Sequence, residues 1–164
     1  MLLLGGVRMT VSPDTDASLS TKASGFVKPI LGSPAARLLA YVALCAAYIQ
    51  GPITKIFDFN GAIAEMTHFG LSPAPTFAVL VIVFELVASA MILFGPWRWL
   101  AAIGLAGFTL MATFVALRFW EIPAGQGRTM AMNAFFEHLG LIGGFVLVAI
   151  DDLTKTEAAA KPIT

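Results

Sequence analysis

Residues 76–94 read TFAVLVIVFELVASAMILF, and Glu85 is the only charged residue among them. A helix needs about 20 predominantly apolar residues to cross the roughly 30 Å of hydrocarbon in a bilayer. In lipid, every backbone N–H and C=O group must find its partner inside the segment, so an apolar run of this length forms a helix. The stretch therefore predicts a membrane-spanning helix.

The rest of the chain has the same character. Hydrophobic residues make up 58% of the sequence and charged residues 12%, whereas about 25% of the residues in soluble domains are charged. Three further apolar runs have the length of a span, at approximately residues 35–57, 99–120 and 132–150. Prolines and glycines mark the breaks between the runs, at residues 72–75, 95–96 and 123–127. We predict an all-α integral membrane protein, a four-helix bundle with short connections.

The segments outside these runs are polar. A stretch rich in Ser, Thr and Asp at residues 10–24 follows a short apolar start that has no basic leader, so the N-terminus does not resemble a signal peptide. We predict an N-terminal cytoplasmic tail over residues 1–34, the four-helix domain over residues 35–151 and a C-terminal cytoplasmic tail over residues 152–164.

The positions of lysine and arginine predict how the protein is oriented in the membrane, because the cytoplasmic loops of membrane proteins carry an excess of both. The side that holds the termini and the hairpin at residues 95–98 carries Arg8, Lys22, Lys28, Arg37, Arg98, Lys155 and Lys161. The opposite side carries only Lys55, Arg118 and Arg128. We therefore expect a multi-pass protein of the bacterial inner membrane, with both termini in the cytoplasm and the loops at residues 58–75 and 121–131 outside.

The net charge and the cysteine content exclude two classes of function. A formal net charge of +0 gives no basic field that could neutralise phosphates, so we expect no nucleic-acid partner. Cys45 is the only cysteine, so the chain has no intrachain disulfide, no CxxC pair and no thiolate metal cluster. Any redox role would need chemistry carried by another group.

Glu85 lies near the middle of its apolar run. An ionised side chain at that depth costs at least about 2.5–3.5 kcal/mol on insertion scales. The carboxyl group therefore meets a partner inside the bundle, or it stays protonated and donates a hydrogen bond. Two interpretations remain open: an interhelical hydrogen bond that fixes the packing, and a carboxyl group that handles protons or binds a ligand.

A second group of polar residues lies near the outer ends of the first, third and fourth runs: Lys55, Asp58, Arg118, Asn133, Glu137 and His138. Asn133 and Glu137 are four residues apart and share one face of a helix. Together the group could line an outward-facing pocket of mixed charge, in which Arg118 or Lys55 pairs with Glu137. Either cation alone could instead reach the lipid headgroups. We predict no metal site, because His68 and His138 lie at unrelated positions.

Two features bear on how the helices pack. Pro52 removes a backbone hydrogen bond from the first helix, which predicts a kink near its outer end. Small residues four apart, such as Gly140 and Gly144, let two helices approach closely. That approach could occur within the chain or between two copies, so a homo-oligomer stays open.

Several short segments lie in a recognisable order along the chain: Arg37, Gly51–Phe59, Phe69–Pro73, Glu85, Leu93–Gly95, Arg98 and Leu139–Gly144. In this order and spacing the sequence resembles the DoxX family of small four-helix membrane proteins, over roughly residues 35–150. The chain has Arg118-Phe119-Trp120 where the family often has a histidine, and His138 where it often has an asparagine. Ala88 and Ser89 stand where glycines usually follow the family's glutamate.

The resemblance implies redox work at the membrane, because DoxX-like proteins have been linked to thiosulfate oxidation that feeds quinone and to complexes that protect against oxidative stress. Our first hypothesis is therefore a subunit of a redox or respiratory complex, with membrane lipid and another membrane or redox protein as partners. The chain itself carries no cofactor, and quinone is the candidate ligand.

A quinone headgroup has polar carbonyl groups on an apolar ring, and its candidate binding residues are Lys55, Glu85, Arg118, Trp120 and His138. Four further residues are assigned to a structural polar cluster: Arg37, Asp58, Asn133 and Glu137. Whether the chain is itself an enzyme stays open. The alternatives are a non-catalytic assembly or structural accessory protein and, with Glu85 as its only support, a small-solute or proton transporter.

Overall fold

The computed structural model describes residues 25, 27–95 and 97–160. Most of the predicted N-terminal tail, Pro96 of the hairpin and the last four residues of the predicted C-terminal tail lie outside the described residues. By its internal contacts the chain divides into two units, residues 1–40 and residues 41–164. The second unit holds most of the predicted four-helix domain.

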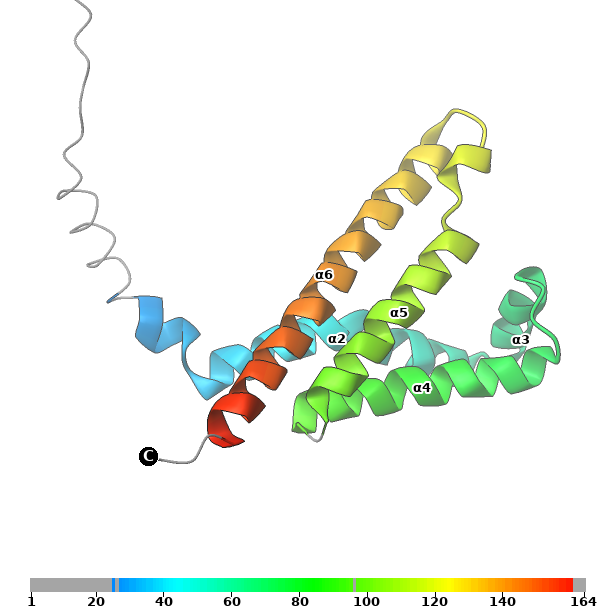
Figure 1. Ribbon diagram of the computed structural model, residues 1–164. Helices are drawn as coiled ribbons and strands as arrows, with labels where there is room; N and C mark the ends of the chain where they lie inside the picture. Colours follow the sequence, from blue (N-terminus) through cyan, green and yellow to red (C-terminus); the bar gives the residue numbers. More distant parts are fainter. Residues whose placement is uncertain (1–24, 26, 96, 161–164) are drawn as a thin grey trace, which may run out of the picture. The chain divides into compact units, whose positions relative to one another are not determined.

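Helices account for all the regular structure of the described residues (Figure 1). They are α2 (Pro34–Phe57), α3 (Phe59–His68), α4 (Ala74–Phe94), α5 (Arg98–Ala116), the short 3-10 helix η1 (Phe119–Glu121) and α6 (Gln126–Ala160). Residues 25 and 27–31, before α2, are helical as well. Four segments are long and apolar enough to cross a membrane: α2, α4, the stretch Arg98–Glu121 and α6. The predicted fold class, an all-α membrane protein with four spans, is confirmed.

The connections differ from the prediction. Residues 59–68, within the connection predicted at residues 58–75, form the helix α3. Asp58 starts this helix because its Oδ1 accepts a hydrogen bond from the Gly61 N–H at 2.9 Å, which satisfies an amide that the first helical turn leaves free. The third helix ends at Ala116, before the predicted Trp120, and α6 begins at Gln126 and continues to Ala160 beyond both predicted ends.

The first unit contains the start of α2. The Ser33 hydroxyl accepts a hydrogen bond from the Ala36 N–H at 3.1 Å, which caps the helix. Arg37, assigned above to a structural polar cluster, lies in this first turn and makes an interaction of its own. It belongs to a different unit from the other members of that cluster.

The main core of the second unit is formed by inward faces of α2, α4, α5 and α6. Its buried residues are Tyr41, Cys45, Tyr48, Ala88, Ile92, Ala101, Ala102, Leu105, Ala106, Phe145 and Ala149. They recur at spacings of three and four within each helix, as one face of a helix requires. Many are alanines, and small residues let membrane helices approach one another closely.

Gly144 of α6 shows this close approach directly. A Cβ atom at Gly144 would lie 3.0 Å from Cδ1 of Leu44 in α2, which is tighter than ordinary van der Waals contact. A side chain at Gly144 would therefore require the Leu44 side chain to shift. A Cβ atom at Gly140 would meet nothing within 4 Å, so only one of the two predicted small residues makes such a contact.

The hairpin between α4 and α5 is held by what we call the Arg98 junction: Arg98, Asp152, Tyr41 and the backbone of Ile92 and Trp99. Arg98 Nε donates to the Ile92 carbonyl at 2.7 Å, and its Nη1 lies 3.5 Å from Asp152 Oδ1. Asp152 Oδ2 accepts from the Trp99 N–H at 3.1 Å. The guanidinium lies 4.7 Å from the centre of the Tyr41 ring. One cation thus joins α2, α4, α5 and α6.

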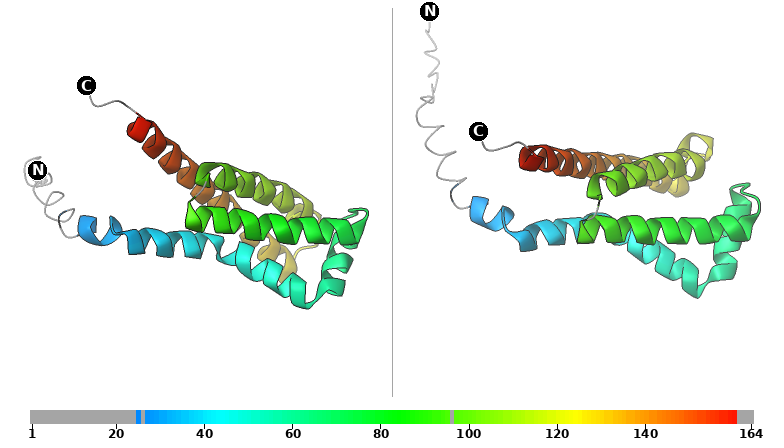
Figure 2. Two further views of the ribbon diagram at one scale, coloured as in Figure 1. Left: turned by 90° about the horizontal axis from the view of Figure 1, so that it is seen from below. Right: turned by 60° about the horizontal axis from the view of Figure 1, so that its bottom comes forward.

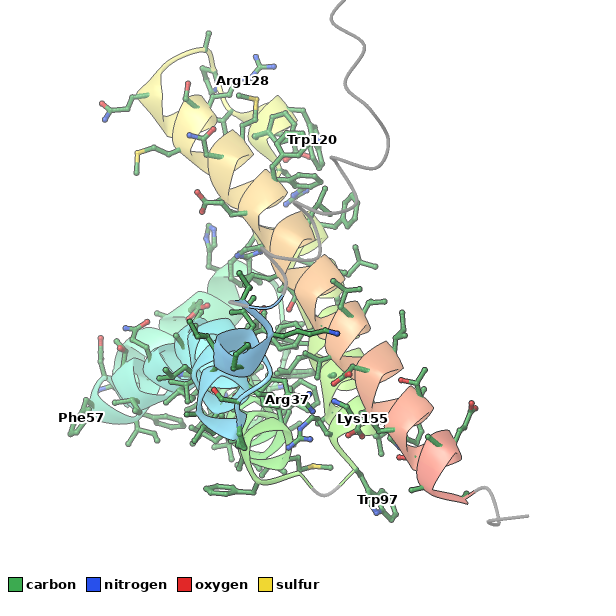
Figure 3. All side chains as sticks on the ribbon, turned by 90° about the vertical axis from the view of Figure 1, so that its left-hand side faces the viewer. Arg37, Phe57, Trp97, Trp120, Arg128 and Lys155 are labelled. Carbon is green, nitrogen blue, oxygen red and sulfur yellow. The ribbon has the colours of Figure 1, made fainter. Side chains whose placement is uncertain are left out.

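The tryptophans near the two ends of the α5–α6 pair agree with a membrane setting. Figure 3 shows Trp120 and Arg128 at one end of the α5–α6 pair, with Trp97 and Lys155 toward the other. Tryptophans at both ends of a pair of spans are typical of interfacial anchors.

Figure 2 shows α2 changing direction in its C-terminal half, as expected of a helix that contains Pro52.

Candidate functional site

Glu85 is buried in the middle of α4, and 9% of its surface is exposed. It belongs to the inward face of that helix, whose buried residues are Ala78, Ile82, Glu85, Ser89 and Ile92, with Ala88 beside them. The N-terminal part of this face packs against α3 through Ala62, Met66 and Ala78. The C-terminal part packs into the main core through Ala88 and Ile92. The carboxyl group therefore lies between two apolar clusters.

Two polar atoms at this position lack partners. Glu85 Oε2 and Ser89 Oγ are buried and have no hydrogen-bond partner among the described residues, and Ser89 is only 1% exposed. The Cys45 thiol lies against Ser89, but a thiol is a weak donor. Because buried polar groups are nearly always hydrogen-bonded, an unpaired carboxyl oxygen and an unpaired hydroxyl side by side call for an explanation.

Lys55 brings a positive charge to the same region. Cys45, Tyr48 and Pro52 are buried on one face of α2, and Lys55, three residues after Pro52, continues that face. Its Nζ lies 3.0 Å from Glu65 Oε2 of α3, and the lysine side chain is 20% exposed. Lys55 and Glu65 are the charged groups that act electrostatically on Glu85. The two members of this ion pair act on the buried carboxyl group in opposite directions.

The ion pair borders a hollow of about 350 Å³ between α2 and α3, which we call the α2–α3 hollow. Its walls are mostly polar: Gln50, Gly51, Thr54, Lys55, Asp58, Gly61, Ala62 and Glu65. The hollow exists because Asp58 ends α2 and begins α3 at the same place. Asp58 lines this hollow and also caps α3.

Two hydroxyl groups in the core join further helices. The Tyr48 hydroxyl lies 2.5 Å from Thr109 Oγ1, and Thr109 donates its own proton to the Leu105 carbonyl at 2.6 Å. A threonine hydroxyl has one proton, so Tyr48 must be the donor. This bond ties α2 to α5.

The same count of hydroxyl protons shows which ring nitrogen of His138 carries a proton. Thr113 Oγ1 donates to the Thr109 carbonyl at 2.6 Å and lies 2.8 Å from His138 Nδ1. Since the hydroxyl proton is already used, the hydrogen bond to His138 must come from an Nδ1–H group. A neutral His138 therefore keeps its Nε2 atom as an acceptor, and the bond ties α5 to α6.

Tyr48→Phe is expected to lower the free energy of unfolding by about 0.6 kcal/mol, the average for a hydrogen bond between membrane helices. Thermal unfolding in detergent would measure the change. Tyr41→Phe is the matched control, because it keeps the ring under Arg98 and removes a hydroxyl that makes no hydrogen bond with the described residues. Equal losses in the two variants would show that the bond between Tyr48 and Thr109 contributes nothing.

The remaining predicted site residues lie elsewhere. Arg118 pairs with Glu121 at 3.2 Å, and both side chains are about 53% exposed. Trp120 belongs to an aromatic cluster with Phe119 and Phe135. Glu137 is exposed, and the predicted pairing with Arg118 or Lys55 is not formed, because both cations have nearer carboxylates.

The structure therefore brings together two of the five candidate binding residues, Lys55 and Glu85. His138 belongs to the contact between α5 and α6, and Arg118 and Trp120 belong to the turn after α5. Asn133 is exposed near the start of α6. Among the residues that the structure describes, no group of three His, Cys, Asp or Glu side chains is placed to hold a metal ion.

Sequence reasoning missed Glu65, Ser89 and Tyr48. Glu65 lies in α3, a helix that the prediction treated as loop. The spacing of Cys45, Tyr48 and Lys55, at three and seven residues, and the four-residue spacing of Glu85 and Ser89 are the signals that could have placed them on shared faces.

A small bundle of apolar helices with one buried carboxyl group defines a multi-pass integral membrane protein. The DoxX family profile matches residues 36–118, so the chain belongs to the DoxX family. It is also similar to "Inner membrane protein YphA" of Escherichia coli (strain K12), with 24% identity over 126 residues, 77% of this chain and 86% of the relative. No solved structure matches it. The chain is thus a DoxX family protein of the inner membrane, and the predicted family is confirmed.

Proposed function

We propose that this protein is an accessory subunit of an inner-membrane redox complex and that it holds a quinone-type headgroup in the α2–α3 hollow. One observation carries the proposal. Glu85 has a buried, unpaired carboxyl oxygen, and the charges that act on it are those of the lysine and glutamate that border the hollow. A buried carboxyl group without a partner, within electrostatic reach of two residues that line a hollow, makes that hollow a candidate ligand site.

The chemistry of the site suits a quinone. A quinone headgroup presents two carbonyl oxygens, which accept hydrogen bonds. The Lys55 ammonium group donates, and Glu85 donates in its protonated form. Ala62, which belongs to the apolar cluster with Met66 and Ala78, lines the hollow and suits the ring of the headgroup.

The accessory role rests on what the chain can contribute. Its single thiol, Cys45, is fully buried and cannot form a disulfide within the chain. The side chains of the site bind and orient a headgroup, whereas electrons would come from a partner protein. The charge asymmetry of the loops supports an orientation with both termini in the cytoplasm, which would open the hollow toward the outer face.

A second candidate function is that of a purely structural accessory protein. It is favoured by the hydrogen bonds of Tyr48 with Thr109 and of Thr113 with His138, which lock helices together. That function has no use for the unpaired oxygen of Glu85, and for this reason we rank it second.

Purification in nanodiscs, followed by mass spectrometry of bound proteins and lipids, tests the proposal. We expect a redox protein at a fixed ratio to the chain, together with quinone above the level found in nanodiscs without it. Lys155 pairs with Asp151 and is not among the residues that line the hollow, so Lys155→Met is the control and Lys55→Met is the variant expected to lose quinone. A preparation with lipid alone, and no quinone in the unmodified protein, would contradict the proposal.

A further inference from the structure

A second hollow, of about 280 Å³, lies beside the turn that follows α5, and we call it the α5–η1 hollow. Its polar walls are His68, at the end of α3, Arg118, just before η1, and Glu121, at the end of η1. The volume is just below the range of about 300–1,000 Å³ that ligand pockets occupy. The hollow therefore suits a small polar group rather than a large ligand.

The α5–η1 hollow lies at a boundary of the membrane. The 19 residues of α5, Arg98–Ala116, rise about 28 Å at 1.5 Å per residue, which nearly spans the roughly 30 Å of hydrocarbon. Trp120, next to the hollow in the chain, lies at this end of the α5–α6 pair (Figure 3), and tryptophans are typical of the headgroup level. The hollow thus opens where lipid headgroups lie.

The hollow offers hydrogen-bond donors and an acceptor side by side. Arg118 Nη1 lies 3.2 Å from Glu121 Oε1, and both side chains are 53% exposed, so this pair contributes little to stability. The pair engages one of the five N–H donors of the guanidinium group. His68, whose ring packs edge-on against Phe69, has at least one N–H donor of its own. Donors for an anion therefore lie next to a carboxylate that can accept from a cation.

The remaining walls of the hollow are apolar. They are formed by Phe69 after α3, Val115 and Ala116 at the end of α5, and Ile122 after η1. Val115 is 41% exposed and Ile122 is 36% exposed, so both present apolar surface beside the polar walls. A ligand that carries both charges on a short polar group, attached to an apolar stem, matches walls of both kinds.

We propose that the α5–η1 hollow binds the headgroup of a phospholipid with a primary ammonium group, of the phosphatidylethanolamine type. The phosphate accepts hydrogen bonds from Arg118 and His68, and the ammonium group donates to Glu121. The planar fork of arginine presents two N–H groups to phosphate at once. A choline headgroup has no N–H group for Glu121, and a free phosphate has no cation for it, so the paired charges favour the ammonium phospholipid over both.

This inference does not rest on the quinone proposal. The α5–η1 hollow and the α2–α3 hollow share no lining residue. Loss of lipid selectivity would therefore leave quinone binding to be judged by its own experiment, and loss of quinone binding would leave the lipid site standing.

Nanodiscs that contain equal amounts of phosphatidylethanolamine and phosphatidylcholine, with the same acyl chains, test the proposal. The full chain is released from them, and the lipids that stay bound are counted by native mass spectrometry. We expect phosphatidylethanolamine to be enriched about tenfold, the factor that corresponds to one hydrogen bond to a charged group. Equal retention of the two lipids would overturn the proposal. Excess inorganic phosphate should leave the enrichment unchanged, and loss of bound lipid to phosphate would contradict a lipid as the source of the anion.

Two substitutions separate the roles of the charged residues. Glu121→Gln is expected to remove the enrichment, because the ammonium group loses its acceptor, and Arg118→Gln should lower the retention of both lipids about tenfold. Arg128→Gln is the matched control, because Arg128 is exposed at the same end of the α5–α6 pair and does not line the hollow. Both substituted side chains are half-exposed, so the variants should unfold at the temperature of the unmodified protein. Enrichment that survives Glu121→Gln, or retention that Arg118→Gln leaves unchanged, would refute the site.

Discussion

Glu85→Leu is expected to raise the thermal stability of the protein and at the same time to remove quinone binding. Leucine fills a similar volume and has no polar atoms to satisfy. Replacing a buried, unpaired polar group by an apolar one removes a desolvation penalty of about 1–3 kcal/mol. The midpoint of thermal unfolding should therefore move upward.

Binding should change in the opposite direction. A hydrogen bond between neutral groups contributes about 0.5–1.5 kcal/mol, so the dissociation constant of a short-chain quinone should rise about 2- to 10-fold in Glu85→Leu. Glu137→Leu is the matched control, because Glu137 is a glutamate of a spanning helix that is exposed and lies outside the site. It should leave the dissociation constant unchanged.

The pair of measurements separates the two candidate functions. If Glu85 only locks the helices together, its replacement by leucine should lower the unfolding temperature. A destabilised Glu85→Leu that still binds quinone as tightly as the unmodified protein would therefore favour the structural function. Opposed changes in stability and binding are typical of a polar group that is kept for function.

Asp152→Ala is expected to give the largest loss of stability. It removes the cap on the Trp99 N–H, which is worth about 1 kcal/mol, and it leaves Arg98 without its carboxylate. An unpaired, partly buried charge adds about 1–3 kcal/mol. The free energy of unfolding should thus fall by about 2–4 kcal/mol, measured by thermal or denaturant unfolding in detergent.

Two further variants refine this prediction. Asp152→Asn keeps an oxygen that can accept from Trp99, so it should cost less than Asp152→Ala, and the difference measures the cap. Lys155→Met breaks the exposed pair with Asp151, and pairs of that kind contribute about 0.3–0.5 kcal/mol. Equal effects of Asp152→Ala and Lys155→Met would show that the Arg98 junction does not hold the hairpin.

The fold could be predicted from the sequence because the bilayer leaves few choices. An apolar run such as residues 76–94 must be a helix in lipid, and four such runs determine a four-span protein. Helix ends were less predictable, because they depend on local caps. Asp58 starts a short helix that mean hydropathy does not reveal, and α6 continues well past the membrane-length run that the prediction used.

The candidate site was only partly predictable. Glu85 stood out because a charge in an apolar run has a high energetic cost, and Lys55 stood out as a cation at a helix end. Their common environment depends on Glu65, which lies in the helix that was expected to be loop. Likewise, Asp152 was assigned to a tail, so its contact with Arg98 could not be foreseen. Ion pairs between helices depend on rotation and depth, which sequence periodicity alone does not determine.

The central claim is that a quinone headgroup binds in the α2–α3 hollow, next to Glu85. The most direct test is labelling with a photoreactive short-chain quinone in nanodiscs, followed by mass spectrometry of the peptides. We expect the label in the segment from Gln50 to Glu65, which lines the hollow, and we expect excess unlabelled quinone to suppress it. Label spread along the lipid-facing sides of all four spans, and unaffected by competitor, would contradict the account.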